Sequence, residues 1–163
     1  TRKLLTSAHD AGAILYYDLN FRKTHIKDIP EVMDNIVENF ELATIVRGST
    51  EDFGYLFGTS VPQEIYDKHM RKHCDLFICT DSCRPISLFT PNISAQYPVE
   101  QITTVSTIGA GDNFNAGFVY GVIQQNLTKT ELSAIDEAAW SELIASGQSF
   151  SKKVCQSIFN YIE

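Results

Sequence analysis

Apolar and polar positions along the chain follow two different periods. Residues 2–11 place apolar side chains at helical spacing, whereas residues 13–17 form a short apolar run typical of a buried strand. Helical and strand patterns continue to alternate up to residue 98, and the segment after Gly111 is mostly helical. We expect helices at 2–11, 30–42, 50–57, 62–73, 111–125, 129–139 and 140–162, and strands at 13–17, 44–47, 75–80, 86–90 and 94–98.

This order of elements predicts the fold class. Strands that alternate with crossover helices form a mostly parallel sheet with helices on both faces, so we expect a three-layer α/β fold. The last two strands, 86–90 and 94–98, are short and separated by turn residues, so we expect them to be antiparallel and at an edge. Because no internal repeat or low-complexity linker divides the chain, residues 1–163 are expected to lie in one domain.

The composition supports a folded core and argues against two kinds of partner. The chain has 163 residues and 44% hydrophobic content, which is enough for one domain with a core. Its 13 basic and 20 acidic residues give a net charge of -7, and no basic stretch is interleaved with aromatic residues, so nucleic acid is not an expected partner. No apolar run reaches membrane-spanning length, so a membrane is not an expected partner either.

The cysteines and histidines do not form a metal-ligand pattern. The four cysteines show neither a Cys-x-x-Cys pair nor a zinc-ligand grouping, so we expect reduced thiols in a cytoplasmic protein. His69 and His73 have the i, i+4 spacing that could place two imidazoles on one helix face, but no third ligand is evident. Because the surrounding sequence is polar, we expect a solvated helix face there instead of a metal site.

The segment Thr104–Phe118, with the sequence TVSTIGAGDNFNAGF, is the main candidate for chemistry. It places glycines and a carboxylate at the start of a helix, where unpaired backbone N–H groups and the macrodipole favour an anion. The amides of Ala110, Gly111 and Asp112 could therefore hold a phosphoryl group. The Asp112 carboxylate could then accept the proton of an attacking hydroxyl group.

A simpler interpretation of the same segment is a turn into a helix, with Asp112 as an ordinary charge at the helix start. The apolar helix that follows, with small residues suited to close packing, favours a buried helix. Since the chain has neither a P-loop pattern nor a dinucleotide-binding glycine pattern after a strand, an anion site would have to lie at Gly109–Asp112.

This segment resembles the second signature of the PfkB (ribokinase-like) family of carbohydrate kinases, Asp-Thr-x-Gly-Ala-Gly-Asp. Ser106 stands in place of the first aspartate of the pattern. The resemblance implies that the last aspartate is the catalytic base and that the threonine and glycines contact the nucleotide. The matching positions are Thr107, Gly109, Ala110, Gly111 and Asp112.

A second element follows the strand at 13–17. The stretch Asp18-Leu19-Asn20-Phe21-Arg22 is similar to the family's Asp-x-Asn-x-Arg element near the site of phosphate transfer. Polar residues just beyond the carboxyl end of a strand lie where open α/β sheets place ligands. The resemblance implies that Arg22 contacts substrate or phosphate, while Asp18 and Asn20 order the same region. The alternative is a solvated loop with a local Asp–Arg pair.

The third element begins at Ser49, where the family usually has Asn-x-x-Glu and the glutamate arranges water around Mg²⁺. This chain has Ser49 and Asp52 at the two positions, and both offer oxygen ligands suited to a hard cation held largely through water. A serine followed three residues later by an acid is also a helix-capping arrangement. The two roles are compatible, and both stay open at this point.

The fourth element begins at Thr80, where the family commonly has Thr-x-Gly-x-x-Gly around the ribose and phosphates of the nucleotide. Thr80 matches this pattern, whereas Ser82 and Pro85 replace the two glycines. Proline fixes φ and removes a donor, so the loop is expected to differ from that of the family. Thr80 and Ser82 are the expected nucleotide-binding residues of this element.

Together, the four elements imply a carbohydrate kinase that uses ATP and Mg²⁺ to phosphorylate a hydroxyl group of a sugar. The stretch after Asp18 looks more like fructokinases than ribokinase proper. The resemblance also implies that residues 1–163 are the C-terminal portion of a ribokinase-like domain whose N-terminal strands and lid are missing, so the fragment alone is expected to be inactive. Many family members dimerise through the lid, so a homodimer stays open.

Two alternatives to a sugar kinase remain. One is a catalytically silent module of the same fold that binds a sugar or nucleotide, which the Ser82, Pro85, Ser49 and Asp52 replacements favour. The other is a nucleoside or vitamin-precursor kinase of the same fold, which a panel of substrates would distinguish.

Overall fold

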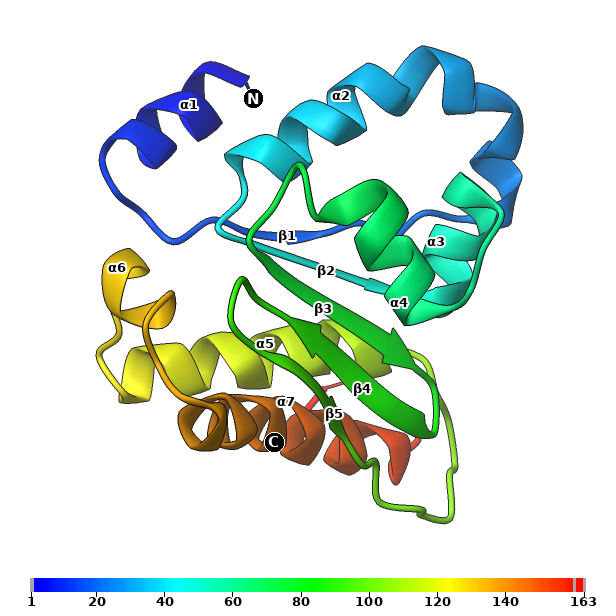
Figure 1. Cartoon of the computed structure of the whole chain (residues 1–163). Helices are drawn as coiled ribbons and strands as arrows, with labels where there is room; N and C mark the ends of the chain where they lie inside the picture. The colour runs from blue at the N-terminus through cyan, green and yellow to red at the C-terminus, as the bar shows by residue number, and fades with distance from the viewer. Residues whose placement is uncertain (1, 160, 163) are drawn as a thin grey trace. The chain divides into compact units, whose positions relative to one another are not determined.

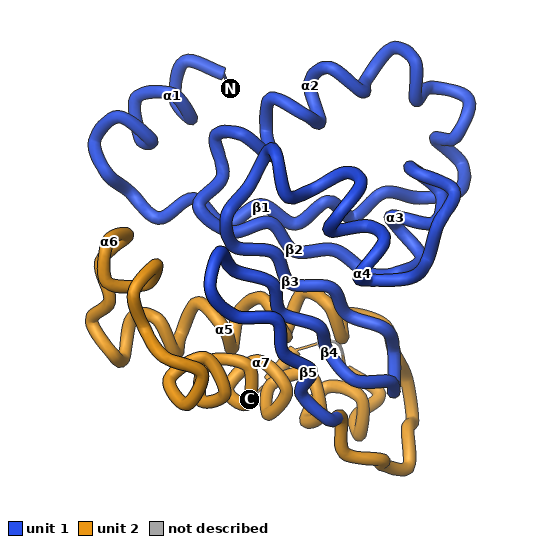
Figure 2. The backbone as a smooth tube through the Cα atoms, viewed as in Figure 1, with its two compact units in different colours: residues 1–98 blue, residues 99–163 orange. Residues whose placement is uncertain are grey.

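The computed structural model describes residues 2–159, 161 and 162 of the chain. The chain divides into two compact units, Thr1–Pro98 (unit 1) and Val99–Glu163 (unit 2) (Figure 2). Unit 1 contains the whole β-sheet, and unit 2 is built from helices (Figure 1). Among the described residues, no helix is both long and apolar enough to cross a membrane.

Unit 1 follows the expected alternation of helices and strands. Its helical elements are α1 (Arg2–Asp10), the 3₁₀ helix η1 (Lys23–Asp28), α2 (Ile29–Leu42), α3 (Thr50–Phe57), α4 (Pro62–Ile65) and the π-helical turn η2 (Tyr66–Met70). Its strands are β1 (Tyr16–Asp18), β2 (Ile45–Ser49), β3 (Leu76–Asp81), β4 (Arg84–Phe89) and β5 (Ser94–Tyr97).

The five strands form one mixed sheet in the order β1-β2-β3-β4-β5 (Figure 1). The first three strands run parallel, as expected for strands joined by crossover helices. The last two strands run antiparallel and end the sheet at one edge, which confirms the expectation for the two short strands. The α/β class is confirmed, and the parallel part of the sheet is β1 to β3.

One face of the sheet carries the core of unit 1 under α2, α3 and α4 (Figure 1). Aromatic side chains fill this core. Phe77 of β3 contacts the ring of Phe53 from α3 edge-on, with 5.2 Å between the ring centroids. Tyr66 stacks on Phe89 of β4 with 4.6 Å between the centroids. Fully burying each such ring contributes about 1.5–3 kcal/mol, so this face anchors the strand ends that carry the polar residues described below.

The segment expected to form one helix over 62–73 is interrupted. It is α-helical at Pro62–Ile65, widens into the π-turn Tyr66–Met70, and then leaves helical geometry. Ile65, Tyr66 and Met70 are all buried in the core of unit 1. The widened turn therefore serves tertiary packing, which the local pattern of apolar residues does not reveal.

Unit 2 contains α5 (Ala110–Gln124), α6 (Lys129–Leu132) and α7 (Glu137–Cys155). The first helix confirms the expectation for 111–125, whereas the helices expected at 129–139 and 140–162 are both shorter. Asp136 explains the boundary between them, because its Oδ1 accepts a hydrogen bond of 2.9 Å from the Ala139 N–H and so caps a new helix.

Helices α5 and α7 pack closely against each other within unit 2. Glycines make the close approach possible, since a Cβ on Gly117 would lie 2.6 Å from the Ser146 carbonyl oxygen. The Ser146 hydroxyl donates a hydrogen bond of 2.7 Å to the Gly117 carbonyl. Phe118 and Trp140 are fully buried and stack with 6.2 Å between ring centroids. The expected buried helix with small packing residues is therefore present.

Candidate functional site

Three of the four candidate elements meet at the carboxyl ends of β1, β2 and β3 in unit 1. The strand register places Asp18 opposite Arg47, and it places Ser49 opposite Thr80. Because parallel strands end at the same edge of a sheet, residues that are far apart in the sequence become neighbours there. The remaining element, Gly109–Asp112, belongs to unit 2.

The turn after β1 has its shape because Asn20 adopts a left-handed backbone conformation with φ of 40°. Asparagine tolerates this region better than most residues that carry a Cβ. The turn buries Leu19 and Phe21 and leaves Asn20 and Arg22 exposed. The two exposed side chains are thus presented to solvent by a loop whose apolar residues are anchored in the core.

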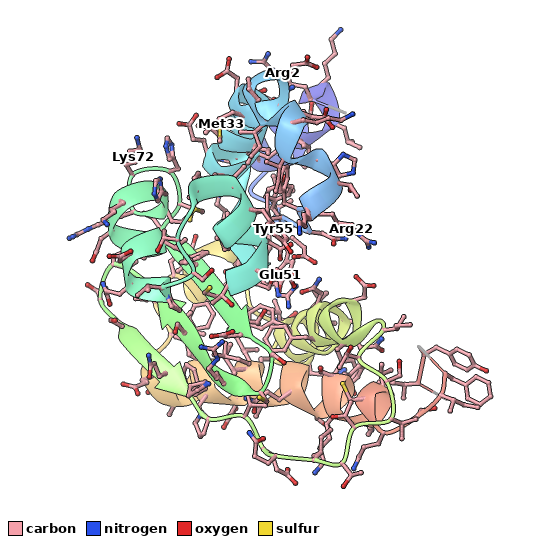
Figure 3. The ribbon with its side chains drawn as sticks, turned by 90° about the vertical axis from the view of Figure 1, so that its right-hand side faces the viewer. Arg2, Arg22, Met33, Glu51, Tyr55 and Lys72 are labelled. Atoms are coloured by element: carbon pink, nitrogen blue, oxygen red, sulfur yellow. The ribbon has the colours of Figure 1, made fainter. Side chains whose placement is uncertain are left out.

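Arg22 lies on the same side of unit 1 as α3 (Figure 3). Figure 3 also labels Glu51 and Tyr55 of α3, and the Tyr55 hydroxyl donates a hydrogen bond of 2.6 Å to Glu51 Oε1. Asp18 pairs with Arg47 of β2, with 3.1 Å between Oδ1 and Nη1. The structure therefore gives Asp18 a cationic partner from the neighbouring strand.

Ser49 and Asp52 form a complete capping box at the start of α3. The Ser49 hydroxyl oxygen accepts a hydrogen bond of 3.1 Å from the Asp52 N–H. In return, Asp52 Oδ2 accepts bonds of 2.8 Å from the Ser49 N–H and 2.6 Å from the Ser49 hydroxyl. The capping role is confirmed. Within the described part of the chain Oδ1 of Asp52 has no hydrogen-bond partner, so one carboxylate oxygen is left to face a cation or its water.

Thr80 is buried, with 9% of the residue exposed. Its hydroxyl accepts a bond of 2.7 Å from Arg47 Nη2 and lies 3.4 Å from the Gly48 carbonyl oxygen, to which it donates. A hydroxyl that donates once and accepts once retains a single acceptor lone pair. The side chain of Thr80 thus bonds to the framework of the sheet, and this leaves little of its capacity for a nucleotide.

The turn after Thr80 differs from a glycine loop, as its sequence led us to expect. Asp81 pairs with Arg84 across a tight hairpin turn in which Ser82 has φ of 52°. Pro85 belongs to β4 and lies next to an irregularity in the β3–β4 ladder between Cys79 and Asp81, where a missing N–H does least harm. The strand β4 therefore begins two residues earlier than the expected Ile86.

Asp81 adds a second polar contact at this edge of the sheet. Its Oδ1 accepts a hydrogen bond of 2.8 Å from the Thr50 hydroxyl, and its Oδ2 lies 3.1 Å from Arg84 Nε. Asp81 is a structural residue of the site that was not predicted from the sequence. The signal in the sequence was that Asp81 and Arg84 flank a two-residue turn, across which an acid and a base can pair.

In unit 2 the GAGD segment forms the start of α5. Gly109 has φ of 78° and lies just before the helix, a conformation that glycine adopts without strain. Its carbonyl accepts bonds of 2.9 Å from the Asn113 N–H and from the Asn113 side-chain amide. Ser106, which replaces the first aspartate of the pattern, accepts a 3.2 Å bond from the Ile108 N–H. The entry to α5 is therefore held by local hydrogen bonds.

The amides at this helix start are not equivalent. The Ala110 N–H donates a bond of 3.2 Å to the Thr107 carbonyl, so it is not the open donor that the sequence led us to expect. The N–H groups of Gly111 and Asp112 have no hydrogen-bond partner among the described residues, as expected for a first helical turn. The Asp112 side chain is exposed. Two amides and one carboxylate thus remain available to a ligand.

These elements can be compared with those of known proteins. A model of the pfkB family carbohydrate kinases matches residues 1–158. The chain belongs to this family. A fructokinase of Rhizobium leguminosarum bv. trifolii is 31% identical over 141 residues, and the match covers 85% of this chain and 43% of that relative. The PfkB-family chain spans about two fifths of the length of the curated relatives it matches.

Solved structures confirm the ribokinase-like α/β fold of this PfkB-family chain. Aminoimidazole riboside kinase from Salmonella enterica, in complex with aminoimidazole riboside and an ATP analog, matches with a TM-score of 0.80 at 22% identity. That match covers 96% of this chain and 50% of the solved chain. A protein from Escherichia coli in complex with ATP and Mg²⁺ matches with a TM-score of 0.75 at 18% identity, over 98% of this chain and 47% of that chain.

Arg47 is a second residue of the candidate site, besides Asp81, that no sequence motif singled out. It is a charged residue inside a buried strand, with 8% of the residue exposed. A charge is rarely buried without partners, so a lone arginine in an apolar strand was the signal that could have found it. Burial raises the pKa of the neighbouring Tyr16 above its usual range, and the positive charge of Arg47 partly offsets this rise.

The histidines differ in part from the expected solvated face. His69 stacks on Phe57, with 4.0 Å between ring centroids and 3° between ring planes. Nδ1 of His73 lies 2.9 Å from Glu41 Oε1. Among the described residues, no group of three His, Cys, Asp or Glu side chains could hold a metal ion.

Proposed function

We propose that the protein carrying this chain transfers the γ-phosphoryl group of ATP to a hydroxyl group of a sugar or sugar-like acceptor. The observation that supports this proposal best is the start of α5. There, within a chain of the pfkB family, the Asp112 carboxylate is exposed beside two amides without partners. Amides at a helix start favour a phosphoryl group, and a carboxylate next to it serves as a proton acceptor.

In the proposed reaction, Asp112 accepts the proton of the acceptor hydroxyl while the hydroxyl oxygen attacks the γ-phosphorus. The bond from the γ-phosphorus to the oxygen bridging to the β-phosphate breaks, and ADP leaves. The N–H groups of Gly111 and Asp112 stabilise the charge on the phosphoryl oxygens, and the positive end of the α5 dipole adds to this effect. Thr107 and Gly109 shape the turn that presents these amides, which is their proposed contribution to nucleotide binding.

Mg²⁺ would neutralise the charge of the phosphates. The residues present suit a cation held mainly through water, because Ser49 and Asp52 offer oxygen atoms and Asp52 Oδ1 has no hydrogen-bond partner among the described residues. A relative of the same fold was solved with ATP and Mg²⁺. We assign Asp52 to the metal's water shell through Oδ1, while Oδ2 holds the helix cap.

The acceptor-side residues of the proposal are Asp18, Asn20 and Arg22. Asn20 and Arg22 are exposed at the carboxyl end of β1, as a ligand contact requires. The named relatives phosphorylate fructose or aminoimidazole riboside according to their names, so a keto sugar and a riboside are the first acceptors to test. The chain alone is expected to have little activity, because it spans only part of its relatives' length. We propose small molecules, a sugar and a nucleotide, as the partners. We also propose a cytoplasmic location, in which the thiols are reduced.

A catalytically silent binding module is the second candidate, and two observations favour it. The capping box uses one oxygen of Asp52, and the Thr80 hydroxyl bonds to Arg47 and Gly48. Such a module would bind nucleotide without consuming it. Calorimetry with ATP and Mg²⁺, followed by a turnover assay, separates the two functions.

The deciding experiment is Asp112→Asn in the complete natural protein, assayed by coupled ADP release with fructose and with aminoimidazole riboside. Loss of a general base lowers kcat by about 10²–10⁴-fold, or about 3–5 kcal/mol in the barrier, while nucleotide affinity stays nearly the same. Asp136→Asn, at the capped start of α7, is the matched control and should keep full turnover. Undiminished turnover by Asp112→Asn would remove Asp112 from the role of base.

A further inference from the structure

The buried charge of Arg47 needs an explanation, because removing a guanidinium from water is costly unless it is paired and hydrogen-bonded. Arg47 is the central residue of β2, and 10% of its side chain is exposed. The neighbouring Val46 and the facing Ile78 are fully buried. An apolar residue at position 47 would therefore fit the sheet, so the guanidinium is present for its contacts.

Those contacts join three strands. Nη1 of Arg47 donates to Asp18 Oδ1 at 3.1 Å, and Nη2 donates to Thr80 Oγ1 at 2.7 Å. Asp18 ends β1, and Thr80 lies near the end of β3, on either side of β2. The three side chains share one face of the sheet, because Asp18 is in register with Arg47 and alternate residues of β2 and β3 face the same way.

The two partners belong to different parts of the proposed site. Asp18 begins the loop that carries Asn20 and Arg22 on the acceptor side. Thr80 begins the hairpin turn on the nucleotide side. The backbone adds to the link, since the Leu19 N–H donates to the Arg47 carbonyl at 3.0 Å. One planar guanidinium thus bonds to a residue at the start of each of the two loops.

We infer that Arg47 is a positioning residue that couples the acceptor loop at 18–22 to the nucleotide turn at 80–85. This inference rests on the proposed kinase function. Arg47 touches neither substrate directly in this role. It sets the distance between the two loops by holding Asp18 and Thr80 with two donors of one planar group, so that both substrates meet a prearranged site.

Lysine at the same position tests the inference sharply. It keeps the positive charge, but as a single ammonium it lacks the two-pronged geometry of a guanidinium. Arg47→Lys should therefore raise the KM values for both ATP and the sugar acceptor by about tenfold, the effect of one lost charge-assisted hydrogen bond. The value of kcat should change by less than about threefold. A purely structural role would lower the amount of folded enzyme and hence the apparent kcat, with both KM values unchanged.

The matched control is Arg2→Lys. Arg2 also pairs with a carboxylate, Glu38 Oε1 at 2.6 Å, but it lies outside the candidate site and 78% of its side chain is exposed. Its variant should keep both KM values within about twofold of those of the natural protein, because exposed ion pairs contribute little. Equal KM effects in the two variants would overturn the special role of Arg47.

Thr80→Val is the second variant, since it removes the acceptor of Nη2 and leaves the charge in place. Thr80 lies on the nucleotide side, so a raised KM for the sugar acceptor in this variant supports coupling. An unchanged acceptor KM overturns it. Valine is β-branched like threonine and has a methyl group in place of the hydroxyl, so this variant gives an independent test of the inference if Arg47→Lys does not fold.

Hydrogen exchange followed by mass spectrometry tests the same coupling without turnover. In Arg47→Lys, amide exchange should become at least several-fold faster in both 18–22 and 80–85. Faster exchange confined to β2 would overturn the inference. If the natural protein shows neither turnover nor ATP binding by calorimetry, the proposed kinase function fails, while the exchange result still decides whether Arg47 couples the two loops.

Discussion

The close packing of α5 and α7 allows a quantitative prediction for Gly117→Ala. A Cβ at position 117 would lie 2.6 Å from the Ser146 carbonyl oxygen and 2.8 Å from the ring of Phe150. The carbonyl oxygen belongs to the backbone of α7, so no change of rotamer can relieve that contact. The two helices would have to move apart, and the Ser146–Gly117 hydrogen bond of 2.7 Å would be lost or lengthened.

The expected change in free energy of unfolding follows from these contacts. Overpacking costs about 1–3 kcal/mol, and the lost hydrogen bond about 1 kcal/mol. Alanine returns about 1 kcal/mol, because it favours a helix more than glycine does. We therefore expect Gly117→Ala to destabilise unit 2 by about 2 kcal/mol. Gly121→Ala is the control. Its Cβ would lie 3.2 Å from the end of the Leu143 side chain, so the gain in propensity roughly offsets the tighter contact and the net change should be near zero.

Urea unfolding monitored by tryptophan fluorescence measures this difference. The chain has one tryptophan, Trp140, which is 1% exposed and lies in α7, so its emission reports on unit 2. The midpoint for Gly117→Ala should fall well below those of the natural chain and of Gly121→Ala, with an unchanged slope. If Gly117→Ala is as stable as the natural chain, the reasoning from close helix approach is wrong.

Two further predictions concern titratable groups. Burial raises the pKa values of Cys74 and Cys79 to about 12. Both thiols should therefore resist alkylation by iodoacetamide at pH 8 in the folded chain, whereas the exposed Cys83 reacts. Rapid labelling of either buried thiol, measured by mass spectrometry, would contradict this prediction. Partial burial, together with two neighbouring lysines, lowers the pKa of His69, which stacks on Phe57. As the pH falls, the unfolded state therefore binds the proton at a higher pH than the folded state does. The stabilisation of the folded state by neutral His69 is complete above the unfolded pKa of about 6.5 and is lost as the pH falls through the lower folded pKa. The thermal midpoint of His69→Phe should fall less than that of the natural chain between pH 7.5 and pH 5, and parallel curves would contradict the assignment.

The sequence predicted those helix starts and ends that depend on residues within one turn of the helix boundary. The α3 boundaries were correct, because Ser49 and Asp52 cap the helix from within one turn and Gly58 ends it with φ of 75°. The start of α5 was also predicted, since its glycines and acid lie together in the chain. The division into two helices after residue 129 was expected, but its position was wrong: α6 ends at Leu132 and α7 begins at Glu137, because Asp136 accepts a hydrogen bond from the Ala139 N–H and caps the new helix there.

By itself, the sequence determined the alternation of strands and helices, the antiparallel edge and the presence of the Gly109–Asp112 helix start, because each depends on residues within a few positions of one another. Only the tertiary structure decided how the polar groups share their hydrogen bonds. Asp52 gives one oxygen to its own helix cap, the Ala110 amide bonds to Thr107, and Arg47 joins Asp18 to Thr80. The two pairings of Arg47 depend on strand register, which brings together residues about thirty positions apart and leaves no local pattern in the sequence.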